Sequence, residues 1–115
     1  MRAIRRLLGV GVALFCLAAG VAQAETFSAE RGAALWTKEV NGQSCTSCHG
    51  KTPKSVGKHT KTGKRIEPMA PSVNPKRLTD PAEIEKWFLR NCKSVYGREC
   101  TAQEKGDILL WLGKQ

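Results

Sequence analysis

The sequence predicts an all-α fold, with three to four helices in one small domain. Three segments carry helix-start signals, at Ser28, Asp80 and Thr101, and each is followed by apolar residues at helical spacing. No segment shows the apolar–polar alternation that is typical of a half-buried strand. The chain has 115 residues, which limits it to a single domain.

The first 24 residues have the composition of a secretory signal peptide. Three arginines precede an uncharged apolar stretch, Leu7–Ala19, and Ala22–Ala24 supplies the small residues that signal peptidase requires. A retained membrane anchor is the alternative, but glycines and a glutamine dilute the apolar stretch. We therefore expect residues 1–24 to be removed and residues 25–115 to form a periplasmic domain.

The first helix of that domain is predicted to run from the N-cap Ser28 to about Lys38. Its inward face is marked by small or aromatic residues at helical spacing: Ala29, Gly32, Ala33 and Trp36. Because Gly32 has no side chain, another helix can cross closely at this point.

A Cys-x-x-Cys-His run follows the turn signal Asn41–Gly42, and it is formed by Cys45, Cys48 and His49. This run is the attachment signature of c-type haem. Two thiols at this spacing can each add to a haem vinyl group, and the adjacent histidine becomes the proximal iron ligand. The reaction belongs to exported proteins, which agrees with the predicted signal peptide.

Two other interpretations of this run are weaker. Zinc motifs place the histidine further from the cysteines, and the remaining pair, Cys92 and Cys100, is eight positions apart. A thiol-disulfide oxidoreductase requires a strand before the motif and a βαβ pattern around it. The sequence therefore predicts one covalent haem c, held by Cys45, Cys48 and His49.

A long basic loop is predicted between Lys51 and Arg77, because the segment has four prolines and little periodicity. Removal of the three signal-peptide arginines lowers the net charge from +9 to +6. The loop alone carries eight basic residues against Glu67. Such a charge in an exported protein favours acidic proteins or an anionic membrane surface over nucleic acid as partners. The loop is interpreted either as a solvated connection or as a surface that steers an acidic redox partner.

Two capping boxes predict the remaining helices. The segment Asp80–Glu83, with proline at the first helical position, starts a helix that is expected to end near Asn91 or Cys92. The segment Thr101–Glu104 starts the terminal helix, whose apolar residues are Ile108, Leu109, Trp111 and Leu112.

One polar residue interrupts the apolar face of the helix after Asp80. Ile84, Trp87 and Phe88 follow the i, i+3, i+4 series, and the i+7 position is Asn91. An inward amide needs a partner. The haem iron is one such partner, and a backbone group at the helix end is the other.

These features together resemble the class I cytochromes c, in which the first and last helices cross at a glycine and an aromatic residue, here Gly32 and Trp111. Three segments resemble more closely the SHP-type (sphaeroides haem protein) cytochromes c: Glu67–Ser72, Trp87–Cys92 and Gly97–Cys100. The resemblance covers essentially the whole mature chain.

The resemblance implies that His49 and the side chain of Asn91 lie on opposite sides of the iron. It further implies that the asparagine leaves on reduction, so that a diatomic gas (O2 or NO) can bind. Dihaem c-type or membrane b-type cytochromes are the redox partners that it suggests.

Other ligands compete for the sixth iron position. Met69 is the most serious, since histidine–methionine ligation is the ordinary electron-transfer arrangement. In small class I proteins, however, the methionine lies just before the last helix, so we expect Met69 to pack against the haem edge instead. His59 lies among lysines and is expected to be exposed, and a lysine or an open position are further alternatives.

The cysteines Cys92 and Cys100 are expected to form a disulfide that closes a nine-residue loop, which stabilises the fold by about 2.5 kcal/mol on the loop-entropy estimate. A structural role is the default interpretation, and coupling to the iron ligand is an additional hypothesis.

The predicted function is that of a monomeric monohaem cytochrome that combines electron transfer with binding of a diatomic gas. The alternative is an ordinary electron carrier that uses Met69. Catalysis is disfavoured, because no distal acid–base pair is evident and no catalytic residue is assigned.

Overall fold

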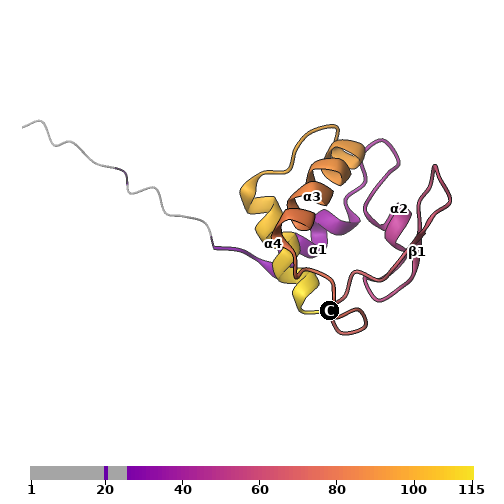
Figure 1. Cartoon of the computed structure of the whole chain (residues 1–115). Coiled ribbons are helices and arrows are strands. Elements are labelled where there is room, and N and C mark those ends of the chain that lie inside the picture. The colour runs from indigo at the N-terminus through magenta and orange to yellow at the C-terminus, as the bar shows by residue number, and fades with distance from the viewer. Residues whose placement is uncertain (1–19, 21–25) are drawn as a thin grey trace, which may run out of the picture.

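The computed structural model describes residue 20 and residues 26–115, so nearly all of the predicted signal peptide lies outside the described residues. Four helices form the described domain, which confirms the all-α prediction: α1 (Ala29–Thr37), α2 (Thr46–His49), α3 (Pro81–Tyr96) and α4 (Ala102–Gly113). In Figure 1, α1, α3 and α4 lie together, and α2 lies with β1 on one side of them. None of the described helices is long and apolar enough to cross a bilayer.

The basic loop contains a short antiparallel hairpin that the sequence analysis did not predict. Its strands are β1 (Gly57–Lys58) and β2 (Arg65–Ile66), with Gly57 opposite Ile66. At the turn, the imidazole Nδ1 of His59 accepts hydrogen bonds from the backbone N–H groups of Lys61 and Thr62. Strands of two residues are too short to produce an alternating pattern, and backbone hydrogen bonds hold this hairpin together.

Helices α1 and α4 cross at Gly32, as predicted. A Cβ atom on Gly32 would overlap the Asp107 carbonyl and would lie 2.8 Å from Trp111 Cβ. Beside the crossing, the buried carboxylate of Asp107 accepts hydrogen bonds from Ser28 N (2.7 Å) and Arg31 Nε (2.7 Å). The start of α1 is therefore held against α4 by close packing at Gly32 and by the hydrogen bonds to Asp107.

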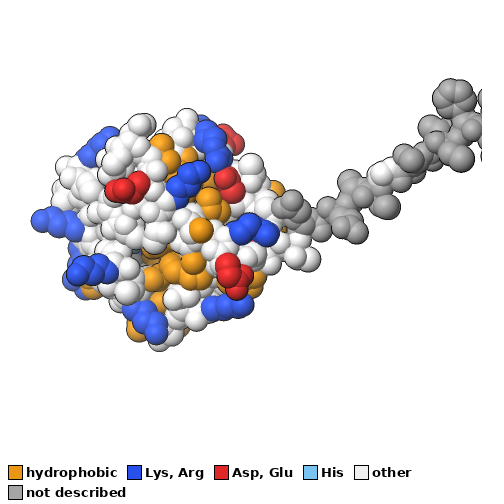
Figure 2. All heavy atoms as spheres, turned by 180° about the vertical axis from the view of Figure 1, so that it is seen from behind, with side chains coloured by type: hydrophobic (Ala, Val, Ile, Leu, Met, Phe, Trp, Pro, Cys, Tyr) orange, Lys and Arg blue, Asp and Glu red, His pale blue; other side chains and the backbone are white. Residues whose placement is uncertain are grey.

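The apolar core is small and lies at this crossing. Its buried residues are Trp36, Ile108 and Leu112. Half-buried apolar side chains from the rest of the chain pack around them: Leu35, Cys45, Met69, Leu78, Phe88 and Trp111. On the face shown in Figure 2, apolar side chains gather in the middle and lysine and arginine side chains surround them.

Helix α3 begins at its predicted cap but differs from the prediction in two respects. The Asp80 carboxylate caps Ala82 N and Glu83 N, whereas the Glu83 side chain binds Lys86 and Trp87 instead of closing a capping box. The helix also continues one turn beyond the predicted end. It ends at Gly97, where the left-handed backbone (φ 70°) favours glycine.

The predicted capping box at the start of helix α4 is confirmed. Its N-cap Thr101 accepts from Glu104 N, and the Glu104 side chain accepts from Thr101 N, so that both halves of the capping box are present.

Candidate functional site

The Cys-x-x-Cys-His run folds as one short turn of helix. Cys45 is the N-cap of α2, and the backbone N–H groups of Cys48 and His49 both donate to the Cys45 carbonyl. Neither thiol takes part in a disulfide, and both are half-buried. The structure therefore brings the three predicted haem-binding residues together, with two thiols available for bond formation.

The imidazole of His49 lies against the core. Its ring centroid is 5.1 Å from that of Trp36, which in turn contacts Trp111 of α4 at 5.5 Å. Burial, together with the nearby positive charge of Arg77, lowers the pKa of His49 to about 4. The imidazole is consequently neutral at pH 7, which is the form that ligates a metal.

The two cysteines have different neighbours. Burial raises the pKa of the Cys45 thiol, and the Tyr96 hydroxyl, which donates to the Leu35 carbonyl (2.5 Å), lies beside it. The Cys48 thiol lies 3.7 Å from Thr60 Oγ1 in the hairpin. Cys45 thus faces the end of α3, and Cys48 faces the basic loop.

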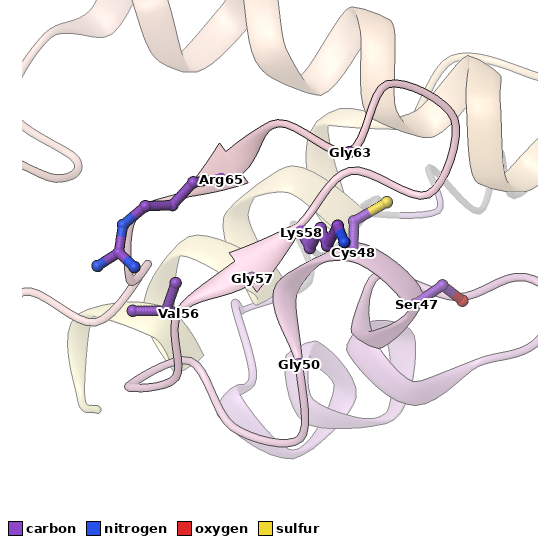
Figure 3. A pocket seen from close by; sticks show the side chains of 8 residues that line it. All are labelled: Ser47, Cys48, Gly50, Val56, Gly57, Lys58, Gly63 and Arg65. Carbon is purple, nitrogen blue, oxygen red and sulfur yellow. The ribbon is translucent and has the colours of Figure 1, made fainter.

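The hairpin packs directly on the backbone of α2. A Cβ atom on Gly57 would overlap the Cys48 carbonyl and would lie 2.9 Å from His49 Cα. Beside this contact lies a hollow of about 530 Å³, and residues of α2 and of the hairpin line it, among them Cys48, Lys58 and Arg65 (Figure 3).

The donor set of this site fits a covalently bound haem. Two free thiols three residues apart can form thioethers, and a neutral imidazole follows directly. The indole Nε1 of Trp36, next to His49, is buried and has no hydrogen-bond partner among the described residues. Buried N–H groups are normally paired, so this nitrogen fits a bound group that carries acceptor atoms.

The zinc and dithiol alternatives fit less well. Cys92 and Cys100 are joined to each other, with their Cα atoms 5.6 Å apart, so they cannot complete a zinc site with Cys45 and Cys48. Among the described residues, no group of three or more histidine, cysteine or carboxylate side chains is placed to hold a metal ion. The residues before the motif form an isolated bridge, Val40–Gln43, rather than a strand of a βαβ unit.

Asn91 lies on α3 with its side chain exposed, and this side chain makes no hydrogen bond within the described part of the chain. The prediction that Asn91 lies inward on the apolar face is therefore wrong for the protein segments described, and so is its interpretation as a buried cap of a backbone group. On the same face, Ile84 and Phe88 are half-buried, whereas Trp87 is 44% exposed. The protein's own segments leave the end of this face uncovered.

Met69 and His59, the two competing candidates for the iron ligand, both contact other parts of the protein. Met69 packs against the cluster of Trp36, Ile108 and Leu112, and its backbone N–H donates to the Pro53 carbonyl (2.8 Å). His59 is half-buried rather than fully exposed, and its Nδ1 is occupied by the hairpin turn.

Sequence reasoning did not give Arg77 or Tyr96 a specific place at the site. Arg77 lies near His49 and donates to the carbonyls of Glu67 (2.9 Å) and Pro68 (3.1 Å). Tyr96 connects the end of α3 with α1 and Cys45. Both belong to segments remote in sequence from the Cys-x-x-Cys-His run, so no spacing pattern could reveal them.

A comparison with known domain families matches residues 22–112 to DUF1924, a domain of unknown function. Among curated proteins, the chain is 51% identical to the cytochrome c-type protein SHP of Cereibacter sphaeroides. The aligned 92 residues cover 76% of this chain and 70% of that protein. The solved structure of oxidised SHP, an oxygen-binding cytochrome c, matches with a TM-score of 0.73 and 50% identity over 77% of this chain and 83% of that chain.

A second relative is cytochrome c'' of Methylophilus methylotrophus. Its solution structure, which concerns the structural basis of haem-ligand detachment in that protein, matches with a TM-score of 0.63 and 34% identity over 73% of this chain and 72% of that chain.

The fold, the site and these relatives define a c-type cytochrome, whose cofactor is haem c. More narrowly, the chain belongs to the DUF1924 family of SHP-type cytochromes c.

Proposed function

We propose that this protein is a periplasmic monohaem cytochrome that combines electron transfer with binding of a diatomic gas, O2 or NO, in its reduced state. The haem supplies an iron that carries one electron and, when ferrous, can bind such a gas. That SHP is an oxygen-binding cytochrome c supports this function for a chain 50% identical to it.

In this proposal Cys45 and Cys48 attach the haem, and His49 is the proximal ligand. Their position on one turn of helix supports these roles, because the turn fixes both thiols relative to the imidazole. Burial keeps the imidazole neutral, and the contact with Trp36 restricts its rotation.

Asn91 is the proposed sixth ligand. The observation that carries the proposal is that its amide is exposed and unbonded within the described residues, one residue before the disulfide-bonded Cys92. An amide oxygen is a hard, neutral donor that binds ferric iron better than ferrous iron. Because no hydrogen bond within the described residues holds it, the Asn91 side chain would be free to rotate away from a reduced haem iron.

The test is a comparison of absorption spectra in the oxidised, reduced and carbon monoxide-treated states. The wild-type protein should show an immediate spectral shift when carbon monoxide is added after reduction. The Asn91→Ala variant should change the oxidised spectrum and leave the reduced one nearly unaltered. The Met69→Leu variant is the matched control, and it should change neither, because Met69 packs in the core.

Two results contradict the proposal. If reduced wild-type protein gives no shift with carbon monoxide, the sixth position is permanently occupied and the protein is an ordinary electron carrier. If Met69→Leu alters the iron spectrum while Asn91→Ala does not, Met69 is the ligand.

A further inference from the structure

We propose that Arg77 is a positioning residue of the haem site, whose fixed positive charge beside His49 raises the reduction potential of the iron. Arg77 thereby favours the ferrous state, which in the proposed function binds the gas. The inference deepens the proposed function and rests on its assignment of His49 as the proximal ligand. It does not depend on the identity of the sixth ligand.

The guanidinium of Arg77 is held by the loop in which it lies. Its Nε donates to the Pro68 carbonyl (3.1 Å), and its Nη2 donates to the Glu67 carbonyl (2.9 Å). The Asn74 side chain donates to the same Pro68 carbonyl (3.0 Å), and the Asn74 carbonyl accepts from the backbone N–H of Arg77 (3.0 Å). Because the side chain is half-buried and bonded at two nitrogens, its charge occupies one position.

The backbone next to Arg77 supports the same placement. Leu78 has a left-handed backbone (φ 60°), which bulky residues rarely adopt, and its side chain packs against the cluster around Trp36. Met69, directly after the carbonyls that Arg77 binds, packs against the same cluster. Such a backbone persists only where the surroundings hold it. Since the Trp36 ring lies 5.1 Å from the His49 imidazole, these contacts hold Arg77 on the wall beside His49.

The charge of Arg77 is not neutralised by a carboxylate of the described residues. Glu67, whose carbonyl Arg77 binds, directs its carboxylate to Arg65 at 2.7 Å. Arg77 itself forms no ion pair in residues 26–115. Burial in the first place, and this charge in the second, lower the pKa of the His49 imidazole, which agrees with a full positive charge close to the ring.

The imidazole of His49 has no hydrogen-bond acceptor in the described part of the chain. The carbonyl of Pro53, four residues further along, already accepts from Met69 N (2.8 Å) and Ala70 N (2.9 Å). An acceptor on the ring N–H makes a histidine a stronger donor to a metal, and a positive charge at the same place has the opposite effect. His49 is therefore a weak electron donor, and a weak donor stabilises ferrous iron relative to ferric iron.

The reduction step changes only the charge of the iron. One electron enters, and no bond at Arg77 or His49 has to form or break. The added negative charge is stabilised by the nearby positive charge, which salt screens little where the charge is partly buried. A nearby unit charge shifts a protonation equilibrium by about tenfold or more, and reduction is likewise a change of one charge.

The experiment is a spectroscopic redox titration of the holoprotein at low and at high ionic strength. Arg77→Gln removes the charge, whereas Arg77→Lys keeps the charge but loses the paired contacts with the two carbonyls. The matched control, Lys76→Gln, removes the same charge from an exposed neighbour that forms no ion pair within the described residues. Resonance Raman spectra of the reduced proteins measure the iron–histidine stretching frequency, and circular dichroism verifies that each variant is folded.

We expect Arg77→Gln to shift the equilibrium about tenfold toward the oxidised protein, which for one electron lowers the midpoint potential by about 59 mV. The shift should persist at high ionic strength, because the charge is partly buried. Arg77→Lys and Lys76→Gln should stay within about twofold of the wild type. The iron–histidine stretch should move to higher frequency in Arg77→Gln alone.

Three results would overturn the proposal. An unchanged potential in Arg77→Gln would mean that the charge does not act on the iron, and an equal shift in Lys76→Gln would make the effect one of net charge. A tenfold shift in Arg77→Lys would make the loop contacts responsible instead of the charge, so this milder variant tests the proposal by itself.

The failure of this inference is distinguishable from that of the proposed function. A missing carbon monoxide shift in the wild type refutes the gas-binding part of the proposed function. The potentials of the three variants still test the role of Arg77 in that case, because the titration requires no open position on the iron.

Discussion

Replacing Gly32 with alanine should destabilise the domain, because two helix backbones meet at this residue. The added Cβ atom would overlap the Asp107 carbonyl and would lie 2.8 Å from Trp111 Cβ, so α4 has to move as a body. Forcing a methyl group into a packed contact costs typically about 1–3 kcal/mol. Since the obstacle here is backbone, we expect a cost near the top of that range, offset by about 1 kcal/mol of better helix propensity.

The net loss in the free energy of unfolding should therefore be about 2 kcal/mol. In a domain of this size, that corresponds to a fall in Tm of roughly 8–16 °C. Urea unfolding of the holoprotein, followed by far-ultraviolet circular dichroism, measures the change directly.

Two glycines of α4 provide controls. A Cβ atom on Gly113 would have no neighbour within 4 Å, so Gly113→Ala should change the stability by no more than about 0.5 kcal/mol. The three atoms nearest to a Cβ atom on Gly106 belong to the ring of Phe27, which is 57% exposed, and not to backbone, so Gly106→Ala should cost less than Gly32→Ala. If Gly32→Ala is as stable as the wild type while both controls behave as expected, the helices do not meet at Gly32 in solution.

Three further predictions follow from the same structure. The double variant Cys92→Ser, Cys100→Ser should lower the free energy of unfolding by about 2.5 kcal/mol, and an unchanged iron spectrum in that variant would remove any coupling between the disulfide and the iron ligand. Tyr96→Phe, which removes the 2.5 Å hydrogen bond to Leu35, should cost about 1 kcal/mol in a urea titration, and a neutral effect would count against that bond. Arg98 lowers the pKa of Glu104 to about 2, so this carboxylate stabilises the fold above its ordinary pKa of 4.5 and the stabilisation is lost as the pH falls toward 2. The difference in the free energy of unfolding between the wild type and Glu104→Gln should accordingly shrink as the pH falls from 4.5 toward 2. The control is Glu99→Gln, which removes the same charge and should not show this change.

The fold was predictable wherever a local signal determines it. The caps at Ser28, Asp80 and Thr101 each start a helix, because the capping side chain bonds to backbone N–H groups only two or three residues further along the chain. The end of α3 was predicted one turn too early, although no helix breaker stands between Cys92 and Gly97 and the glycine itself marks the observed end. The hairpin was missed for a different reason, since contacts made after chain collapse decide its two-residue strands.

The candidate site divides in the same way. Cys45, Cys48 and His49 are contiguous, so their mutual placement follows from one turn of helix and could be read from the sequence. The neutral imidazole, by contrast, depends on burial and on Arg77, which lies 28 positions away. Such electrostatic partners come from tertiary packing, which spacing patterns along the chain do not encode.

The backbone of α3 is restrained near its C-terminus, whereas the side chain of Asn91 on the same helix is not. Its C-terminal turn is fixed at two points, by the disulfide from Cys92 to Cys100 and by the hydrogen bond from Tyr96 to Leu35.

Asn91 precedes the first of these points by one residue, and Phe88, one turn earlier, packs on the core. The backbone at Asn91 is thus restrained on both sides, while its amide makes no bond within the described residues. If Asn91 holds the iron of a bound haem, its release would require only a rotation of this side chain and no displacement of α3. Rotamer changes of partly exposed side chains are fast, so stopped-flow reduction of the holoprotein should show no slow conformational phase that the Asn91→Ala variant lacks.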